Sequence, residues 1–174
     1  ILIHAAAGGV GLIVCQWAKA LGAKVIGTVG SDEKAALAKA HGCDHPIVYT
    51  REKFAERVRE LTVGEGVAVV YDSIGKDTFM DSLSCLRPMG MMALFGAASG
   101  PVPPFDLGLL AKMGALFITR PTLFVYTAKR SDLVQTADEL QQLLVAARGR
   151  QRVAVAVRVE VDVVHRFQPR QALQ

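Results

Sequence analysis

Length, composition and charge describe an ordinary globular chain and exclude several classes of protein. The 174 residues include 51% apolar and 21% charged side chains, which suffices for one domain with a sizeable core. The net charge is +4, but the basic residues are scattered and not interleaved with aromatic ones, so they do not favour a nucleic acid partner. No apolar run approaches the roughly 18 residues of a membrane span, and we expect no membrane partner.

The cysteines indicate a reducing compartment. Cys15, Cys43 and Cys85 are odd in number, and none belongs to a C-x-x-C pair. Such spacing favours reduced thiols packed in a core over a disulfide framework or a zinc site. We therefore predict a cytoplasmic protein.

The chain opens on a short apolar run that ends in a turn of small residues, ILIHAAAGGVG at residues 1–11. The glycine positions of the dinucleotide fingerprint G-x-G-x-x-G fall on Ala6, Gly8 and Gly11. In that fingerprint the second glycine lets the backbone approach the pyrophosphate, and the third lets the following helix lie against the strands. The phosphate would bind unpaired amides at the helix start, so Ala6, Gly8, Gly9, Val10 and Gly11 are candidate cofactor ligands. The alternative is a glycine-rich turn that binds no nucleotide.

Strand patterns and helix patterns alternate after this turn. Beyond the first strand, we expect strands at residues 24–29, 47–49, 67–71, 89–95 and 115–119. We expect helices at residues 10–21, 31–41, 52–61, 76–86, 107–112 and 131–148, with His45 in a surface loop. This alternation predicts an α/β fold, a doubly wound parallel sheet of the Rossmann type.

The end of the chain departs from this pattern. Valines alternate with other residues over 153–163, which predicts a half-buried strand of another layer or domain. The first strand begins at residue 1 and the last residues, 165–174, stop within a helix-like run. Both features indicate a fragment of a longer protein.

Five strings of residues carry a family resemblance: AAAGGVG, QWAKALGAKVIGTVGS, VVYDSIGKDTF, ALFGAASG and LFITRPTL. In this order they resemble the quinone oxidoreductase branch of the zinc-free medium-chain dehydrogenases and reductases, the group that includes zeta-crystallin. The resemblance is dense over residues 1–130 and loose beyond them. It implies an NAD(P)-binding Rossmann domain at 1–150, with 151–174 beginning the return to a largely absent catalytic domain.

The end of the second strand bears on the choice of cofactor. An NAD-preferring site places a carboxylate there, whereas this chain has none before Asp32. A 2′-phosphate could accept hydrogen bonds near Gly30 and Ser31 and find a positive charge in Lys34. The resemblance implies the same, because Gly30, Lys34 and Tyr49 match positions that surround this phosphate in NADPH-dependent relatives. We therefore predict NADPH.

The resemblance also assigns a loop to the nicotinamide end of the cofactor, at Phe95, Gly96 and Ala98. Phe95 could equally be part of the core. Asp72, at the end of a buried strand, could cap the next helix or touch the cofactor loop, and we expect the cap. The four histidines show no ligand spacing and no Ser/His/Asp order stands out, so we name no catalytic residue and no metal. A reductase in which the cofactor carries the chemistry needs neither.

The function implied by the resemblance is hydride transfer from NADPH to quinones or related enones without a metal. The chain alone would turn over little, and a homodimer would form through the strand at residues 115–119. One alternative is a nucleotide-binding, RNA-binding or crystallin-like module without catalysis. Another is an enoyl reductase or alcohol dehydrogenase of the same superfamily.

Overall fold

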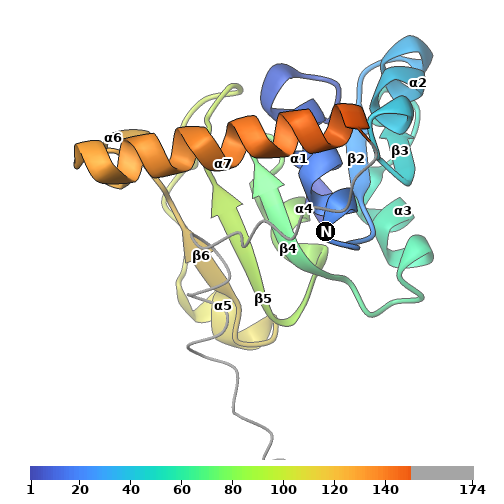
Figure 1. The fold of residues 1–174 in the computed structure, drawn as a ribbon. Coiled ribbons are helices and arrows are strands. Elements are labelled where there is room, and N and C mark those ends of the chain that lie inside the picture. The colour runs from blue at the N-terminus through green and yellow to red at the C-terminus, as the bar shows by residue number, and fades with distance from the viewer. Residues whose placement is uncertain (150–174) are drawn as a thin grey trace, which may run out of the picture.

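The computed structural model describes residues 1–149, which fold around one parallel sheet (Figure 1). Six strands lie in the order β3-β2-β1-β4-β5-β6, and every neighbouring pair is parallel. Their bounds are β1 (Leu2–Ile3), β2 (Ile26–Val29), β3 (His45–Val48), β4 (Val67–Asp72), β5 (Leu86–Leu94) and β6 (Phe117–Thr119). This order is that of the dinucleotide-binding Rossmann fold, with its switch point between β1 and β4. The predicted fold is confirmed.

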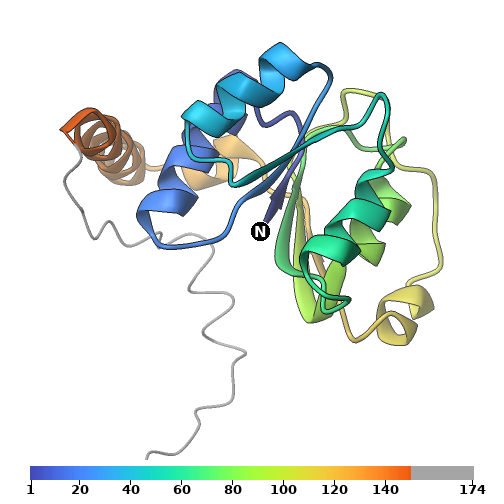
Figure 2. The ribbon, with the colours of Figure 1, turned by 90° about the vertical axis from the view of Figure 1, so that its right-hand side faces the viewer.

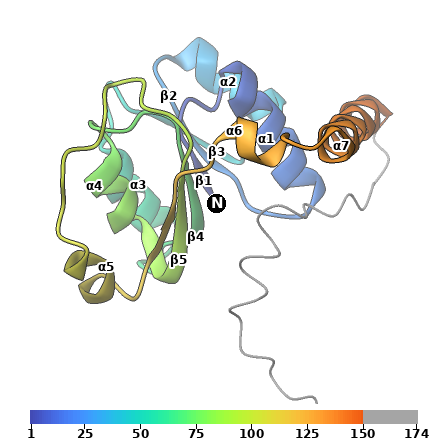
Figure 3. The same ribbon diagram turned by 90° about the vertical axis from the view of Figure 1, so that its left-hand side faces the viewer.

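Helices cover both faces of the sheet. They are α1 (Gly9–Ala20), α2 (Asp32–Ala40), α3 (Phe54–Leu61), α4 (Phe79–Ser84), α5 (Gly108–Lys112), α6 (Leu123–Tyr126) and α7 (Arg130–Gly149). Figure 3 shows α3, α4 and α5 on one side of the sheet and α1, α6 and α7 on the other. Figure 2 shows the same layers from the opposite end of the molecule. Among the described residues, no helix is both long and apolar enough to cross a bilayer.

The central strand β1 joins two apolar cores. Leu2 and Ile3 are both fully buried, and they face opposite sides because successive side chains of a strand alternate. Leu2 belongs to the core under α3 and α4 with Val58 and Leu83. Ile3 belongs to the core under α1 and α2 with Cys15. The apolar start of the chain therefore forms the middle of the molecule.

Turn residues end the helices as the sequence predicts. Gly22 follows α1 with φ +82°, and Gly42 follows α2 with φ +100°, both in the left-handed region that favours glycine. Ser31 caps α2, its Oγ accepting a hydrogen bond from the Lys34 amide.

Two expectations need correction, and one helix was missed. His45 does not lie in a loop: it begins β3, and Pro46 within that strand is tolerated because β3 is an edge strand of the described sheet. α4 begins at Phe79, because the residues before it form a turn around the Asp72 carboxylate. The short helix α6 was not predicted. The strand predicted at 153–163 lies outside the described residues.

Candidate functional site

The glycine turn packs the start of α1 tightly against β1. A Cβ atom at Gly11 would lie 2.3 Å from the carbonyl oxygen of Ala5 and 2.7 Å from the Cα of Ala6, so only glycine fits there. Ala5 itself has φ +52°, a strained conformation for an alanine. At Gly9 a Cβ would meet nothing within 4 Å, so the space outside the turn is open.

Amides at the start of α1 point out of this turn. Within residues 1–149, the amides of Gly9, Val10 and Gly11 have no acceptor, and the amide of Leu12 is the first to bond back, to the Gly8 carbonyl at 2.9 Å. Gly8 is the N-cap residue and offers no capping side chain. Free donors at the positive end of a helix dipole bind phosphate well. The open, glycine-lined turn therefore fits a pyrophosphate.

A second set of candidate cofactor-binding residues lies where β2 and β3 end. The Tyr49 hydroxyl lies over Gly30, 3.1 Å from where a Cβ of that glycine would stand, and the Tyr49 side chain is exposed. Lys34 lies exposed in the first turn of α2, one turn from Gly30. The structure thus brings Gly30, Ser31, Lys34 and Tyr49 to one corner of the sheet.

An ion pair that sequence reasoning missed lies at the same corner. The Arg51 guanidinium donates two hydrogen bonds to the Asp32 carboxylate, Nη1 to Oδ2 at 2.7 Å and Nη2 to Oδ1 at 2.5 Å. These hydrogen bonds hold the pKa of Asp32 below its usual range. The chain positions are 19 apart, so no local pattern links the two residues.

The loop after β5 is hydrogen-bonded to the end of β4 and the residue that follows it. The amide of Phe95 donates to the Asp72 carbonyl at 2.9 Å, and the amide of Ala98 donates to the Ser73 carbonyl at 3.1 Å. A Cβ at Gly96 would lie 2.4 Å from that same Ser73 oxygen. Phe95 is half-buried and Ala98 is exposed. This loop also lies at the carboxyl edge of the sheet, beside the switch point.

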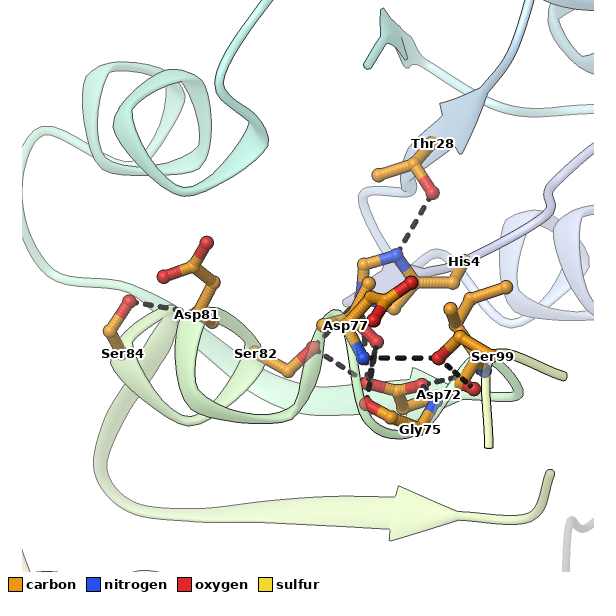
Figure 4. A network of polar contacts seen from close by, with 11 residues as sticks. His4, Thr28, Asp72, Gly75, Asp77, Asp81, Ser82, Ser84 and Ser99 are labelled. Atoms are coloured by element: carbon orange, nitrogen blue, oxygen red, sulfur yellow. Dashed lines mark hydrogen bonds and ion pairs between the residues drawn. The ribbon is translucent and has the colours of Figure 1, made fainter. Parts of the chain in front are cut away.

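Beneath the switch point lies a buried polar network (Figure 4). The Asp72 carboxylate accepts hydrogen bonds from the amides of Ile74 and Gly75 and from the hydroxyls of Thr78 and Ser82, at 2.8 to 3.0 Å. Thr78 is the N-cap residue of α4. Asp72 therefore orders the turn that leads into α4 by holding its N-cap residue, and does not itself occupy the cap position.

His4 connects this network to β2. Its Nδ1 lies 2.9 Å from the Thr28 hydroxyl and its Nε2 lies 2.9 Å from the Ser82 hydroxyl. Because Ser82 donates its proton to Asp72, it accepts from Nε2–H of His4, and Nδ1 accepts from Thr28. Burial lowers the pKa of His4, and the nearby Asp72 carboxylate only partly opposes this shift. The ring is therefore a neutral link between β1, β2 and α4.

The sequence does not predict this role of His4, whose spacing from the other histidines is not that of metal ligands. The one available signal was a polar residue at the end of an apolar strand, immediately before the glycine turn. Among residues 1–149, no three His, Cys, Asp or Glu side chains gather as a metal site would require.

Comparison with known proteins identifies the family. Residues 9–144 match the family model described as zinc-binding dehydrogenase. The chain belongs to this family. It is 55% identical over 144 residues to a quinone oxidoreductase of Pseudomonas aeruginosa, a match that covers 83% of this chain and 44% of that protein. It is 56% identical over 137 residues to a 2-haloacrylate reductase of a Burkholderia species, covering 76% of this chain and 40% of that protein.

Solved structures of zinc-binding dehydrogenase relatives agree with the fold. The Escherichia coli quinone oxidoreductase in complex with NADPH superposes with a TM-score of 0.79 at 50% identity, over 89% of this chain and 47% of that one. The Pseudomonas syringae quinone oxidoreductase superposes with a TM-score of 0.80 at 52% identity, over 88% of this chain and 46% of that one. The chain therefore spans less than half the length of these relatives. The resemblance drawn from the five sequence strings is confirmed.

Proposed function

We propose that this chain is the NADPH-binding part of a quinone oxidoreductase. The observation that carries the proposal is the single sheet edge at which the free amides of α1 and the Gly30 corner lie together. Ligands of open α/β sheets bind in the crevice at this edge. The relatives named quinone oxidoreductase, one of them solved with NADPH, support the same function.

Three groups of residues would each bind a different part of the cofactor. The turn formed by Ala6, Gly8, Gly9, Val10 and Gly11 would hold the pyrophosphate. The corner formed by Gly30, Ser31, Lys34 and Tyr49 would hold the 2′-phosphate, with Lys34 supplying the positive charge. The loop with Phe95, Gly96 and Ala98 would lie along the nicotinamide end.

NADPH, when bound, supplies a hydride that a quinone or a related enone can accept. The residues of this chain bind and orient the cofactor, and none is assigned to catalysis. The relative named 2-haloacrylate reductase supports an activated alkene as a further substrate class. We place the Rossmann domain at residues 1–150 and the return to a catalytic domain at 151–174, and we expect little turnover by this chain alone.

We also propose a homodimer in the cytoplasm. β6 is the last strand in the sheet order, so its copy in a second chain could extend the sheet. Light scattering on the purified chain tests the dimer, and a monomer mass at working concentration would contradict it.

The three buried free thiols support the proposed reducing compartment, the cytoplasm.

Calorimetric titration with NADPH and then NADH tests the cofactor assignment. We expect NADPH to bind more tightly, and Lys34→Ala to weaken NADPH binding about tenfold while leaving NADH unchanged, because one exposed charge is removed from the phosphate. Lys39→Ala, in the last turn of the same helix, is the matched control. A folded wild-type chain that binds neither nucleotide would refute the proposal.

A further inference from the structure

The Asp32–Arg51 ion pair stands directly beside the corner that selects between NADPH and NADH. Asp32 is the first residue of α2, two positions after Gly30. Arg51 follows β3 and is two positions after Tyr49, whose hydroxyl lies over Gly30. The hydroxyl of Thr50, between them, donates to the Gly30 carbonyl at 3.5 Å. Asp32 and Arg51 thus lie next to the corner, one on each of the two segments that form it.

A carboxylate in this place has opposite effects on the two cofactors. At the end of the second strand, it accepts hydrogen bonds from the ribose hydroxyls of NADH and repels the 2′-phosphate of NADPH. Asp32 is the first carboxylate after β2 and lies three positions beyond its last residue, Val29, where an unpaired negative charge would repel a 2′-phosphate at the corner. Both oxygens of Asp32 are instead engaged by the Arg51 guanidinium.

The exposure of both side chains limits what this pair contributes to folding stability. The Arg51 side chain is 56% exposed and the Asp32 side chain is 73% exposed. Pairs between exposed side chains contribute little to folding, because water screens the attraction and both side chains lose freedom. The bidentate geometry does fix where both charges lie, which is the property a selective site needs.

We propose that Arg51 is a specificity-determining residue, which preserves the preference for NADPH by neutralising Asp32 at the 2′-phosphate corner. The inference rests on the proposed function, since it assumes that the cofactor binds at this edge. Arg51 acts here through Asp32 and is not itself required to touch the phosphate.

The test is a double-mutant cycle on nucleotide binding. The dissociation constants for NADPH and NADH are measured by calorimetry at low salt for wild type, Arg51→Ala, Asp32→Asn and the double variant. Arg57→Ala is the matched control, because Arg57 is likewise partly exposed and paired with carboxylates, those of Glu52 and Glu60. Circular dichroism and a melting curve check that each variant is folded.

We expect Arg51→Ala to lower the preference for NADPH over NADH about tenfold, the effect of one uncompensated charge near a phosphate in water. In the Asp32→Asn background, removal of Arg51 should leave the preference at or above that of wild type. Arg57→Ala should not change it.

Two results would overturn the inference while leaving the proposed function intact. The first is an unchanged preference in Arg51→Ala when Lys34→Ala still weakens NADPH binding. The second is an equal loss of preference with and without Asp32, since Arg51 would then act on the phosphate directly. A folded wild-type chain that binds neither nucleotide would overturn both proposals together.

Discussion

The Nε2 atom of His4 lies 2.9 Å from the hydroxyl of Ser82, a residue 78 positions along the chain. The Ser82 hydroxyl in turn donates a hydrogen bond to the Asp72 carboxylate, and the Thr28 hydroxyl bonds to Nδ1 on the other side of the His4 ring. All four residues are buried. The result is a directed chain of hydrogen bonds that links β2, β1, α4 and β4 immediately below the switch point of the sheet.

This arrangement predicts loss of stability in mild acid. Burial holds the pKa of His4 below its ordinary value of 6.5, so near that pH the unfolded chain takes up a proton that the folded chain does not. The contribution of neutral His4 to the free energy of unfolding is therefore fully present above pH 6.5. It falls as the pH drops below 6.5 toward the lower pKa of the folded state. Urea unfolding at about pH 7.5 and about pH 5.5 measures this loss, which the unfolded pKa limits to at most about 1.4 kcal/mol.

The His4→Gln variant isolates this contribution. It should cost about 2 kcal/mol at neutral pH, because a buried hydrogen-bonded ring is lost, and it should have a smaller pH dependence than wild type. His41, half-buried at the C-cap of α2, provides the control, and His41→Gln should remain within about 0.5 kcal/mol of wild type. An equal acid response in wild type and His4→Gln would assign the effect to other groups.

Replacement of Asp72 by asparagine should be among the most damaging single changes. The carboxylate accepts four hydrogen bonds in a buried site, whereas an amide would turn an NH2 group toward some of the same donors. We expect a loss of about 3 kcal/mol in the free energy of unfolding, measured with urea. Asp77→Asn, at an exposed position in the same turn, should be nearly neutral. A stable Asp72→Asn variant would show that the turn can form without the carboxylate.

The glycine turn offers a matched pair of substitutions. Gly11→Ala would force a methyl group against the Ala5 carbonyl and the Ala6 backbone, and should cost about 3 kcal/mol. Gly9→Ala meets open space within α1 and should stabilise the chain by up to about 1 kcal/mol, because alanine favours helix. Thermal unfolding of both variants tests the packing, and equal melting temperatures would contradict it.

The thiols should be unreactive in the folded chain. Burial raises the pKa of Cys85 to about 12, and a hydrogen bond with Cys15, together with burial, raises the pKa of Cys43. The same hydrogen bond lowers the pKa of Cys15, whose side chain is protected by being fully buried. Since the thiolate is the reactive form, a thiol reagent at about pH 8 should modify none of the three in the native chain and all three in denaturant. Fast modification of any one of them without denaturant would show that its site opens.

Local chemistry made much of this fold predictable. The ends of α1 and α2 follow from Gly22, Gly42 and Ser31, residues whose effect depends on the backbone immediately around them. The parallel sheet follows from the alternation of strand and helix. Each helix carries the chain back to the end of the sheet at which the preceding strand began, so the next strand runs in the same direction. The start of α4 was misplaced because the Asp72 carboxylate binds the preceding turn, a tertiary effect that helix patterns do not contain.

The candidate site likewise contains residues that the sequence could predict and contacts that it could not. Residues next to strand ends, such as Gly30 and Phe95, could be placed because the carboxyl edge of a parallel sheet collects them. The pairing of Arg51 with Asp32 and the hydrogen bonds of His4 could not, because each joins segments whose approach is set by the folded sheet.

The central place of β1 has a consequence for how the chain folds during synthesis. β1 can pair with β2 once residue 29 has been made, but its other partner, β4, is complete only at residue 72. Until then Leu2 and Ile3 belong to a half-sheet with one unpaired edge, and such edges invite wrong pairing with other chains. Between residues 29 and 72, synthesis therefore passes through a stage at which the central strand of the finished sheet is still an edge strand.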